Sequence, residues 1–207
     1  MGLIDKRLLT MNTIKVLIEG YAKENEDGTF NASSSTVLIE SNGKKILVDP
    51  GCNKELLLEA LKKENLTTDD IDVLFISHYH PDHILNIRLF PNHDIYDGDT
   101  IYRDDLEIEY DNTCIPDTDI KILETPGHAH EQCSLVVEVN NEIYVVAEDV
   151  FWWMNGEQKD LTREELINME DPYVKDINVL KESRKKVLDI ADWIIPGHGK
   201  MFKNPKA

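Results

Sequence analysis

The sequence predicts an α/β fold in which helices cover β-sheets. Two patterns predict it: short apolar segments typical of strands recur along the chain, and two segments with apolar residues at helical spacing lie among them. The 207 residues show no internal repeat, low-complexity tract or long linker. We therefore expect a single domain over residues 1–207 with one substantial core.

The first third of the chain is predicted to form a strand, a loop and a hairpin. Residues 14–18 are typical of a strand, and residues 36–48 of a hairpin that turns at Asn42-Gly43. Between them, residues 21–35 are rich in Asn, Ser, Gly and charge and predict a loop. The position of this loop makes it a candidate flap over a site.

Two helices are predicted from capping and spacing. Asn53 can cap a helix that runs to about Asn65 and carries leucines on one face. A second helix is expected from about Tyr173 to Ala191, because its apolar residues recur at helical spacing. Within it, the basic cluster of residues 181–186 is expected to be a solvated helix face.

The remaining predicted strands precede residues that could bind a metal ion or a substrate. Residues 92–118 are typical of short strands and turns, and the stretch from Asp149 to Asp171 is expected to be less regular. The other strand candidates are residues 71–77, 120–124, 134–139, 142–147 and 193–195.

The strongest functional signal is the segment His78-Tyr79-His80-Pro81-Asp82-His83, which follows a buried strand directly. A turn there can direct His78 and His80 to one metal ion while Asp82 and His83 reach a neighbouring point. Imidazole and carboxylate ligands suit zinc, iron and manganese, and no thiolate accompanies them. Tyr79 is expected to turn away from the ligands into packing.

Three later segments repeat one arrangement, in which an apolar strand ends and a metal-capable residue follows. His128 follows residues 123–127, Asp149 follows residues 145–148, and His198 follows residues 194–197. Because strand ends in an α/β fold converge on one edge, these residues can meet the first segment there.

This set of residues resembles the metallo-β-lactamase superfamily, in order and over roughly residues 36–200. The resemblance implies an αββα four-layer sandwich, with two β-sheets flanked by helices and the site along one edge. It also implies that His78, His80 and His128 hold a first metal ion, that Asp82, His83 and His198 hold a second, and that Asp149 bridges both. Glu148 is a departure, because the superfamily usually has Gly before the bridging Asp.

Within the superfamily, the sequence is most similar to the branch of metallo-β-lactamase domain-containing protein 1 and its microbial relatives. The residues that carry this closer resemblance are 83–86, 89–91, 148–151, 182–188, 191–192 and 196–199.

Substrate contacts are expected beside the metal ligands. Phe151, Trp152 and Trp153 follow Asp149 closely, and consecutive large aromatic residues can wall a substrate pocket. His130 is a further candidate, two residues after His128. Apolar residues expected to be exposed, such as Trp152 or Phe202, favour a homodimer.

The leading functional prediction is a dinuclear-metal-dependent hydrolase. Two divalent ions, zinc first and iron or manganese as alternatives, would generate hydroxide at neutral pH for attack on a small ester, thioester or lactone. Asp82 is the candidate catalytic residue, placed both to ligate and to orient the nucleophile. One alternative is a phosphodiesterase or ribonuclease, which the resemblance to the closer branch implies. The other is a non-hydrolytic, iron-binding redox protein.

Charge and hydropathy restrict the partners. The formal net charge of −18 repels phosphate backbones, so a small-molecule substrate is favoured over nucleic acid. No stretch approaches the ~18 apolar residues that span a bilayer, and the N-terminus lacks the pattern of a secretory signal. We therefore expect a cytoplasmic protein without membrane contact.

Overall fold

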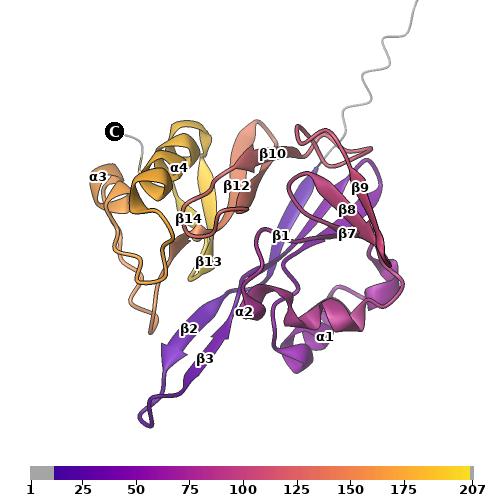
Figure 1. Cartoon of the computed structure of the whole chain (residues 1–207), viewed down its shortest axis with the longest axis horizontal. Helices are drawn as coiled ribbons and strands as arrows, with labels where there is room; N and C mark the ends of the chain where they lie inside the picture. The colour runs from indigo at the N-terminus through magenta and orange to yellow at the C-terminus, as the bar shows by residue number, and fades with distance from the viewer. Residues whose placement is uncertain (1–11, 206–207) are drawn as a thin grey trace, which may run out of the picture.

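The computed structural model describes residues 12–205, which form two β-sheets stacked face to face (Figure 1). The N-terminal segment, in which no secretory signal is predicted, lies outside the described residues. The first sheet has the order β1-β4-β5-β6-β7-β8-β9 and the second the order β10-β11-β12-β13-β14. The strands of the first sheet are β1 (Thr13–Ile18), β4 (Thr36–Ser41), β5 (Lys44–Val48), β6 (Val73–Phe75), β7 (Ile95–Tyr96), β8 (Thr100–Arg103) and β9 (Leu106–Glu109). Those of the second are β10 (Lys121–Glu124), β11 (Cys133–Val139), β12 (Glu142–Trp152), β13 (Trp193–His198) and β14 (Phe202–Lys203).

Side-chain alternation along the strands divides the apolar residues between two layers. In β4, Val37 and Ile39 face the second sheet and belong to the core between the sheets, whereas Leu38 faces outward. The second sheet contributes Leu135 and Val146 to the same inner core. The core between the two sheets is therefore built by strands that bury both of their faces.

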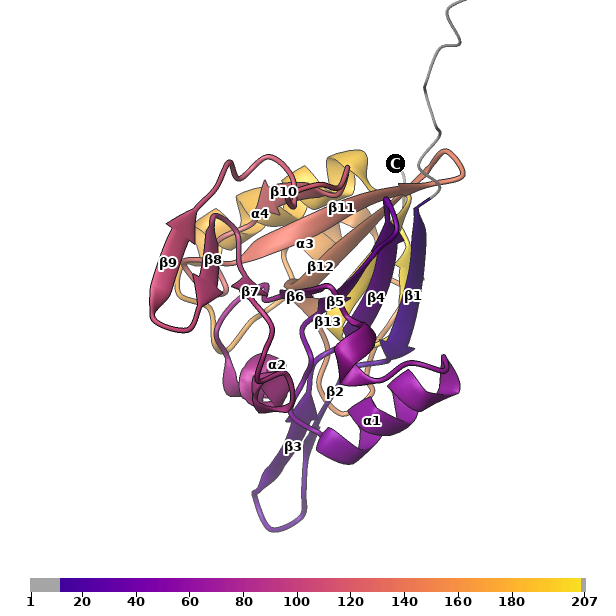
Figure 2. The same cartoon turned by 90° about the vertical axis from the view of Figure 1, so that its right-hand side faces the viewer.

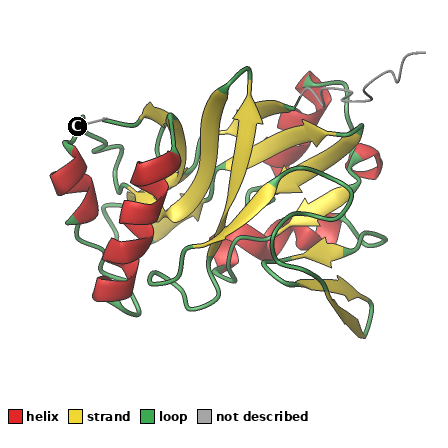
Figure 3. Cartoon of the chain, turned by 90° about the horizontal axis from the view of Figure 1, so that it is seen from above, coloured by secondary structure: helices red, strands yellow, loops and turns green. Residues whose placement is uncertain are grey.

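Helices cover the outer face of each sheet (Figures 2 and 3). On the first sheet, α1 (Lys54–Lys63) packs Leu57 and Leu61 into a cluster with Leu47 and Leu74. On the second, α3 (Arg163–Ile167) and α4 (Ile177–Ile190) form another cluster with strands β12 and β13. Two short 3-10 helices, η1 (Thr68–Asp70) and η2 (Leu85–Leu89), and the short helix α2 (Pro81–Ile84) complete the helices of the described region. The layers run helix, sheet, sheet, helix, which confirms the predicted αββα sandwich.

Helix starts follow their caps. The Asn53 side chain accepts from Leu56 N at 3.2 Å, as predicted for α1. The second long helix was predicted to begin near Tyr173, but it begins at Ile177, because the Asp176 carboxylate accepts from the backbone N–H groups of Asn178 and Val179. Pro172 and the turn that contains it lie outside the helix.

Arg184 corrects the prediction of a solvated basic face on α4. Its side chain is fully buried, and its guanidinium donates to the carbonyl oxygens of Val150, Ile167 and Met169. Burial lowers the pKa of Arg184 to about 10. This buried cation ties α4 to the end of α3 and to β12.

Two segments predicted to be irregular are ordered. Residues 21–35 contain a hairpin of β2 (Tyr21–Glu24) and β3 (Phe30–Ser33), which projects from the body of the molecule in Figure 1. Strand β12 continues through Trp152, and α3 begins at a capping box of Thr162 and Glu165 within the stretch after Asp149.

Across residues 12–205, every helix is too short or too polar to cross a membrane.

Candidate metal centre

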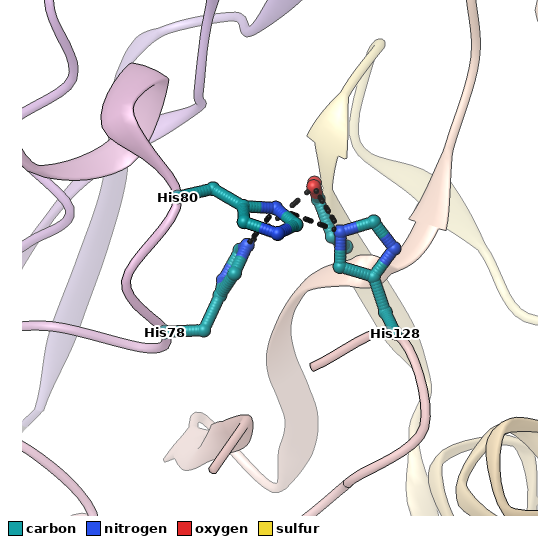
Figure 4. Close-up of side chains that lie close together, drawn as sticks. His78, His80 and His128 are labelled. Carbon is teal, nitrogen blue, oxygen red and sulfur yellow. Dashed lines mark hydrogen bonds and ion pairs between the residues drawn. The ribbon is translucent and has the colours of Figure 1, made fainter. Parts of the chain in front are cut away.

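The structure brings all seven predicted ligands together where strands of both sheets end. The turn after β6 and the start of α2 supply His78, His80, Asp82 and His83, while the loop after β10 supplies His128. From the second sheet, Asp149 comes from within β12 and His198 from the last residue of β13. Figure 4 shows the rings of His78, His80 and His128 turned toward one another.

The first group of donors consists of His78, His80, His128 and Asp149. His80 Nδ1 lies 3.1 Å from His78 Nε2 and 3.0 Å from His128 Nε2. Asp149 Oδ2 lies 3.2 Å from His128 Nε2 and 3.7 Å from His78 Nε2. Four ligands held about 2.0–2.1 Å from a tetrahedral zinc ion stand about 3.3 Å apart, so this spacing fits such an ion.

The second group consists of Asp82, His83 and His198, with Asp149 beside it. Asp82 Oδ2 lies 3.2 Å from His198 Nε2 and 3.9 Å from His83 Nε2. Asp149 Oδ2 is 3.4 Å from His83 Nε2, and Asp149 Oδ1 is 3.6 Å from His198 Nε2. The Asp149 carboxylate therefore stands between the two groups and has an oxygen near each.

Burial and charge in the cluster favour a bound cation. Burial lowers the pKa of His78 well below its usual value. Burial alone would raise the pKa of Asp149, but His83 and His198 hold it well below its usual range. His83 Nε2 and Asp149 Oδ1 are buried without a hydrogen-bond partner among the described residues. Buried polar atoms rarely remain unpaired, so their convergence on one point is the arrangement expected of metal ligands.

Two carboxylates behind the histidines were not identified from the sequence. Asp49 accepts from Ser77 N at 2.8 Å and contacts His83 Nδ1 at 2.7 Å. Asp171 contacts His128 Nδ1 at 2.7 Å, and together with Asp149 it raises the pKa of His128 to about 9 against the effect of burial. A carboxylate on the outer nitrogen fixes the ring and makes it a stronger ligand. Asp49 precedes the Pro50-Gly51 turn at the end of a strand, and this position could have indicated a role at the site. Nothing in the sequence connects Asp171 to His128.

Replacing Asp171 by asparagine is expected to weaken metal binding about 10- to 100-fold, because the asparagine keeps the shape but loses the charge on His128 Nδ1. Competition with a chromophoric chelator measures the change. The exposed substitution Asp189→Asn is the control and should leave the affinity unchanged. Equal affinities of Asp171→Asn and wild type would show that the carboxylate does not support the site.

Glu148 occupies a backbone conformation that favours glycine. Its φ is +45°, and its side chain is completely buried, with both carboxylate oxygens unpaired among the described residues. Oε2 lies 3.8 Å from His83 Nδ1, and burial raises the pKa of Glu148 well above its usual value. The departure from the superfamily pattern thus places a buried carboxyl group behind the second donor group.

Only one of the three consecutive aromatic residues reaches the site. Trp152 lines a pocket of about 350 Å³ beside the donors. Phe151 is fully buried in the core beneath α4, so its predicted substrate contact is wrong. Trp153 lines a separate cleft with Phe202, and His130 is exposed and does not line the pocket. Trp152 itself is only 8% exposed, so it is not an exposed apolar residue that would favour a homodimer.

The pocket is also lined by the segment predicted to be a flap and by two residues that the sequence did not mark. Ala22, Phe30 and Ala32 come from the β2–β3 hairpin, whereas Met154 and Tyr173 were not identified from the sequence. Tyr173 packs against Trp152 with ring centroids 5.8 Å apart. The hairpin therefore occupies the position predicted for a flap.

Fold and site together define an α/β sandwich with a cluster of histidines and aspartates at one edge. Residues 30–111 match the model of the metallo-β-lactamase superfamily. Metallo-β-lactamase domain-containing protein 1 of Mus musculus is 31% identical over 201 residues, which cover 91% of this chain and 73% of the relative. The chain belongs to the metallo-β-lactamase superfamily, and the predicted resemblance is confirmed.

Solved structures agree on the fold. A Thermotoga maritima protein assigned to the metallo-β-lactamases superposes with a TM-score of 0.68 at 19% identity, covering 93% of this chain and 99% of that one. The dizinc quorum-quenching lactonase AidC, solved with a homoserine product, gives a TM-score of 0.60 at 17% identity and covers 86% of this chain and 81% of its own. Superfamily membership implies a metal-dependent hydrolase in general terms.

Proposed function

We propose that this protein is a dinuclear-metal hydrolase of small, uncharged esters, thioesters or lactones. The observation that carries the proposal is the position of Asp149, which has one carboxylate between two groups of histidine and aspartate donors. The donor set of imidazoles and carboxylates favours zinc, with iron and manganese as alternatives. His78, His80 and His128 would hold one ion and Asp82, His83 and His198 the other.

When bound, two such ions lower the pKa of a shared water to near neutrality and stabilise negative charge on the substrate oxygen. Asp82 is suited to orient that water. Burial would raise the pKa of its carboxyl group, but His198 and His83 hold it below the usual value, so the group remains an anionic acceptor. It also lines the pocket, which places it beside a bound substrate.

The pocket itself supports an uncharged, largely apolar substrate. Its volume of about 350 Å³ lies at the small end of ligand sites. Alanine, phenylalanine, tryptophan, methionine and tyrosine side chains surround the donors, and no lysine or arginine among the described residues lines it. A carboxylate or phosphate group on the substrate would have no cationic side chain in this pocket to pair with. The net charge of −18 adds to this disadvantage.

A substrate panel tests the proposal on the zinc-loaded protein. We expect kcat/KM for a short uncharged ester, thioester or lactone to exceed that of a carboxylate-bearing analogue of equal size by at least about 10-fold, since a buried charge without a partner is costly. A preference for phosphodiesters would favour the phosphodiesterase or ribonuclease alternative. Failure to hydrolyse any substrate, combined with reversible oxidation of bound iron, would favour the redox alternative.

A further inference from the structure

His80 is held differently from the other histidines of the site. His78, His83 and His128 direct Nε2 toward the donor groups, and Nδ1 of each contacts an outer partner: Ser77 Oγ, Asp49 and Asp171, respectively. His80 instead directs Nδ1 at the cluster, and its Nε2 has no hydrogen-bond partner within residues 12–205. Its ring orientation must therefore depend on the main chain that carries it.

The main chain at this point lies in a turn and not in a sheet. His80 is the N-cap residue of the four-residue helix α2, and residues 76–80 are outside any strand. His198 also lacks a partner on Nδ1, but it ends β13, where its carbonyl accepts from Trp153 N at 2.9 Å. A ligand in a short turn needs another anchor if its position is to be fixed before metal binding.

Tyr79 supplies contacts on both sides of this turn. Its hydroxyl donates to Asp97 Oδ2, and its backbone N–H donates to Glu131 Oε1 at 3.3 Å. Tyr79 thus points away from the cluster as predicted, but its ring is 42% exposed and is not part of the core. An exposed tyrosine between two ligands, held by its hydroxyl, is explained better by anchoring than by packing.

Asp97 is itself fixed. It follows β7, and its Oδ1 accepts from the backbone N–H groups of Asp99 and Thr100 at 3.1 and 2.8 Å. The Tyr102 hydroxyl also donates to Oδ2, at 3.0 Å. The carboxylate is therefore oriented by the turn between β7 and β8, and the Tyr79 hydroxyl binds to a rigid acceptor.

We propose that Tyr79 is a positioning residue, whose hydrogen bond to Asp97 fixes the turn between His78 and His80 and so raises the affinity of the three-histidine group for its metal ion. The inference rests on the proposed function, because it takes these histidines as metal ligands. Removing an outer partner of a ligand usually weakens metal binding about 10- to 100-fold, and we expect the lower end here because the contact acts through the main chain.

Two matched substitutions test this. Tyr79→Phe and Tyr102→Phe each remove one hydroxyl that donates to the same oxygen of Asp97. The two hydroxyls lie 3.2 Å apart, so Tyr102→Phe also removes a neighbour of the Tyr79 hydroxyl, but only Tyr79 lies between ligands. The metal dissociation constants of both variants and of wild type are measured by chelator competition with Zn²⁺, and the site geometry is followed by the visible spectrum of the Co²⁺ form. Thermal unfolding of the metal-free proteins reports any general loss of stability.

We expect Tyr79→Phe to raise one dissociation constant about 10-fold and to alter the Co²⁺ spectrum, while Tyr102→Phe stays within about 2-fold of wild type. Wild-type affinity in Tyr79→Phe, or an equal loss in both variants, would overturn the inference and leave the proposed function standing. A wild-type protein that binds no metal would overturn both.

Discussion

Under the proposed function, replacing Asp149 by alanine is expected to abolish binding of both metal ions and to lower hydrolysis by at least about 1,000-fold, because this carboxylate would serve both donor groups and the ions would generate the nucleophile. The side chain is 5% exposed and lies 3.2–3.7 Å from four histidine nitrogens. Without it, Nε2 of His78 and of His128 would lose the carboxylate beside them, and Nε2 of His83 and of His198 would keep only Asp82. Metal content after dialysis and turnover of the best substrate measure the two losses together.

The exposed substitution Asp105→Ala is the control for removal of a negative charge, and it should retain both metal and activity. Circular dichroism of Asp149→Ala shows whether the fold persists. A folded, metal-free Asp149→Ala protein with wild-type turnover would remove metal-assisted hydrolysis as the mechanism.

Replacing Gly197 by alanine is expected to lower metal affinity by at least about 100-fold, although Gly197 is not a ligand. A Cβ at this position would stand 1.8 Å from Asp149 Oδ1 and 3.1 Å from Asp149 N. The φ of Gly197 is not positive, so alanine fits the backbone and the effect comes from the clash alone. The Asp149 carboxylate would have to leave its place between the two donor groups.

Gly43→Ala is the control for a general loss of stability, because its φ is +80° and its new Cβ would meet no atom within 4 Å. Chelator competition and thermal unfolding of both variants separate a local effect on the site from a general loss of stability. Normal metal affinity in Gly197→Ala would mean that Asp149 can bind from another position.

The fold class and the residues that gather at the site could be predicted because their signals are local. The hairpin of β4 and β5 has its own Asn-Gly turn, and α1 has its own cap at Asn53. Four of the seven donors lie within residues 78–83, and the other three each follow an apolar strand. Convergence of strand ends then places them together without knowledge of any particular contact.

The pairing of β2 with β3 could not be predicted, because it depends on contacts outside the segment. The two strands have no alternating apolar pattern, and their outer anchors are distant: Asn155 N donates to Ala22 O at 2.7 Å, and Cys52 N to Ser33 Oγ at 3.1 Å. Because these contacts come from distant parts of the chain, the sequence of the segment itself shows only the polar composition that is typical of a loop.

The predicted substrate contact of Phe151 was wrong because the prediction treated three consecutive aromatic residues alike and did not separate the two faces of β12. Val145 and Ala147 face α4, and strict alternation would place Asp149 and Phe151 on that side too. The register against β13 shifts on both sides of Glu148, where the backbone adopts a positive φ. This irregularity turns Asp149 and Trp152 toward the site and leaves Val150 and Phe151 in the core.

Native mass spectrometry of the zinc-reconstituted protein tests the central claim most directly. The account predicts two ions on each wild-type chain and one on each of His128→Ala and His198→Ala, with the single ion retained in a different group in each variant. A wild-type chain that retains no ion, or a stoichiometry that neither substitution changes, would contradict it.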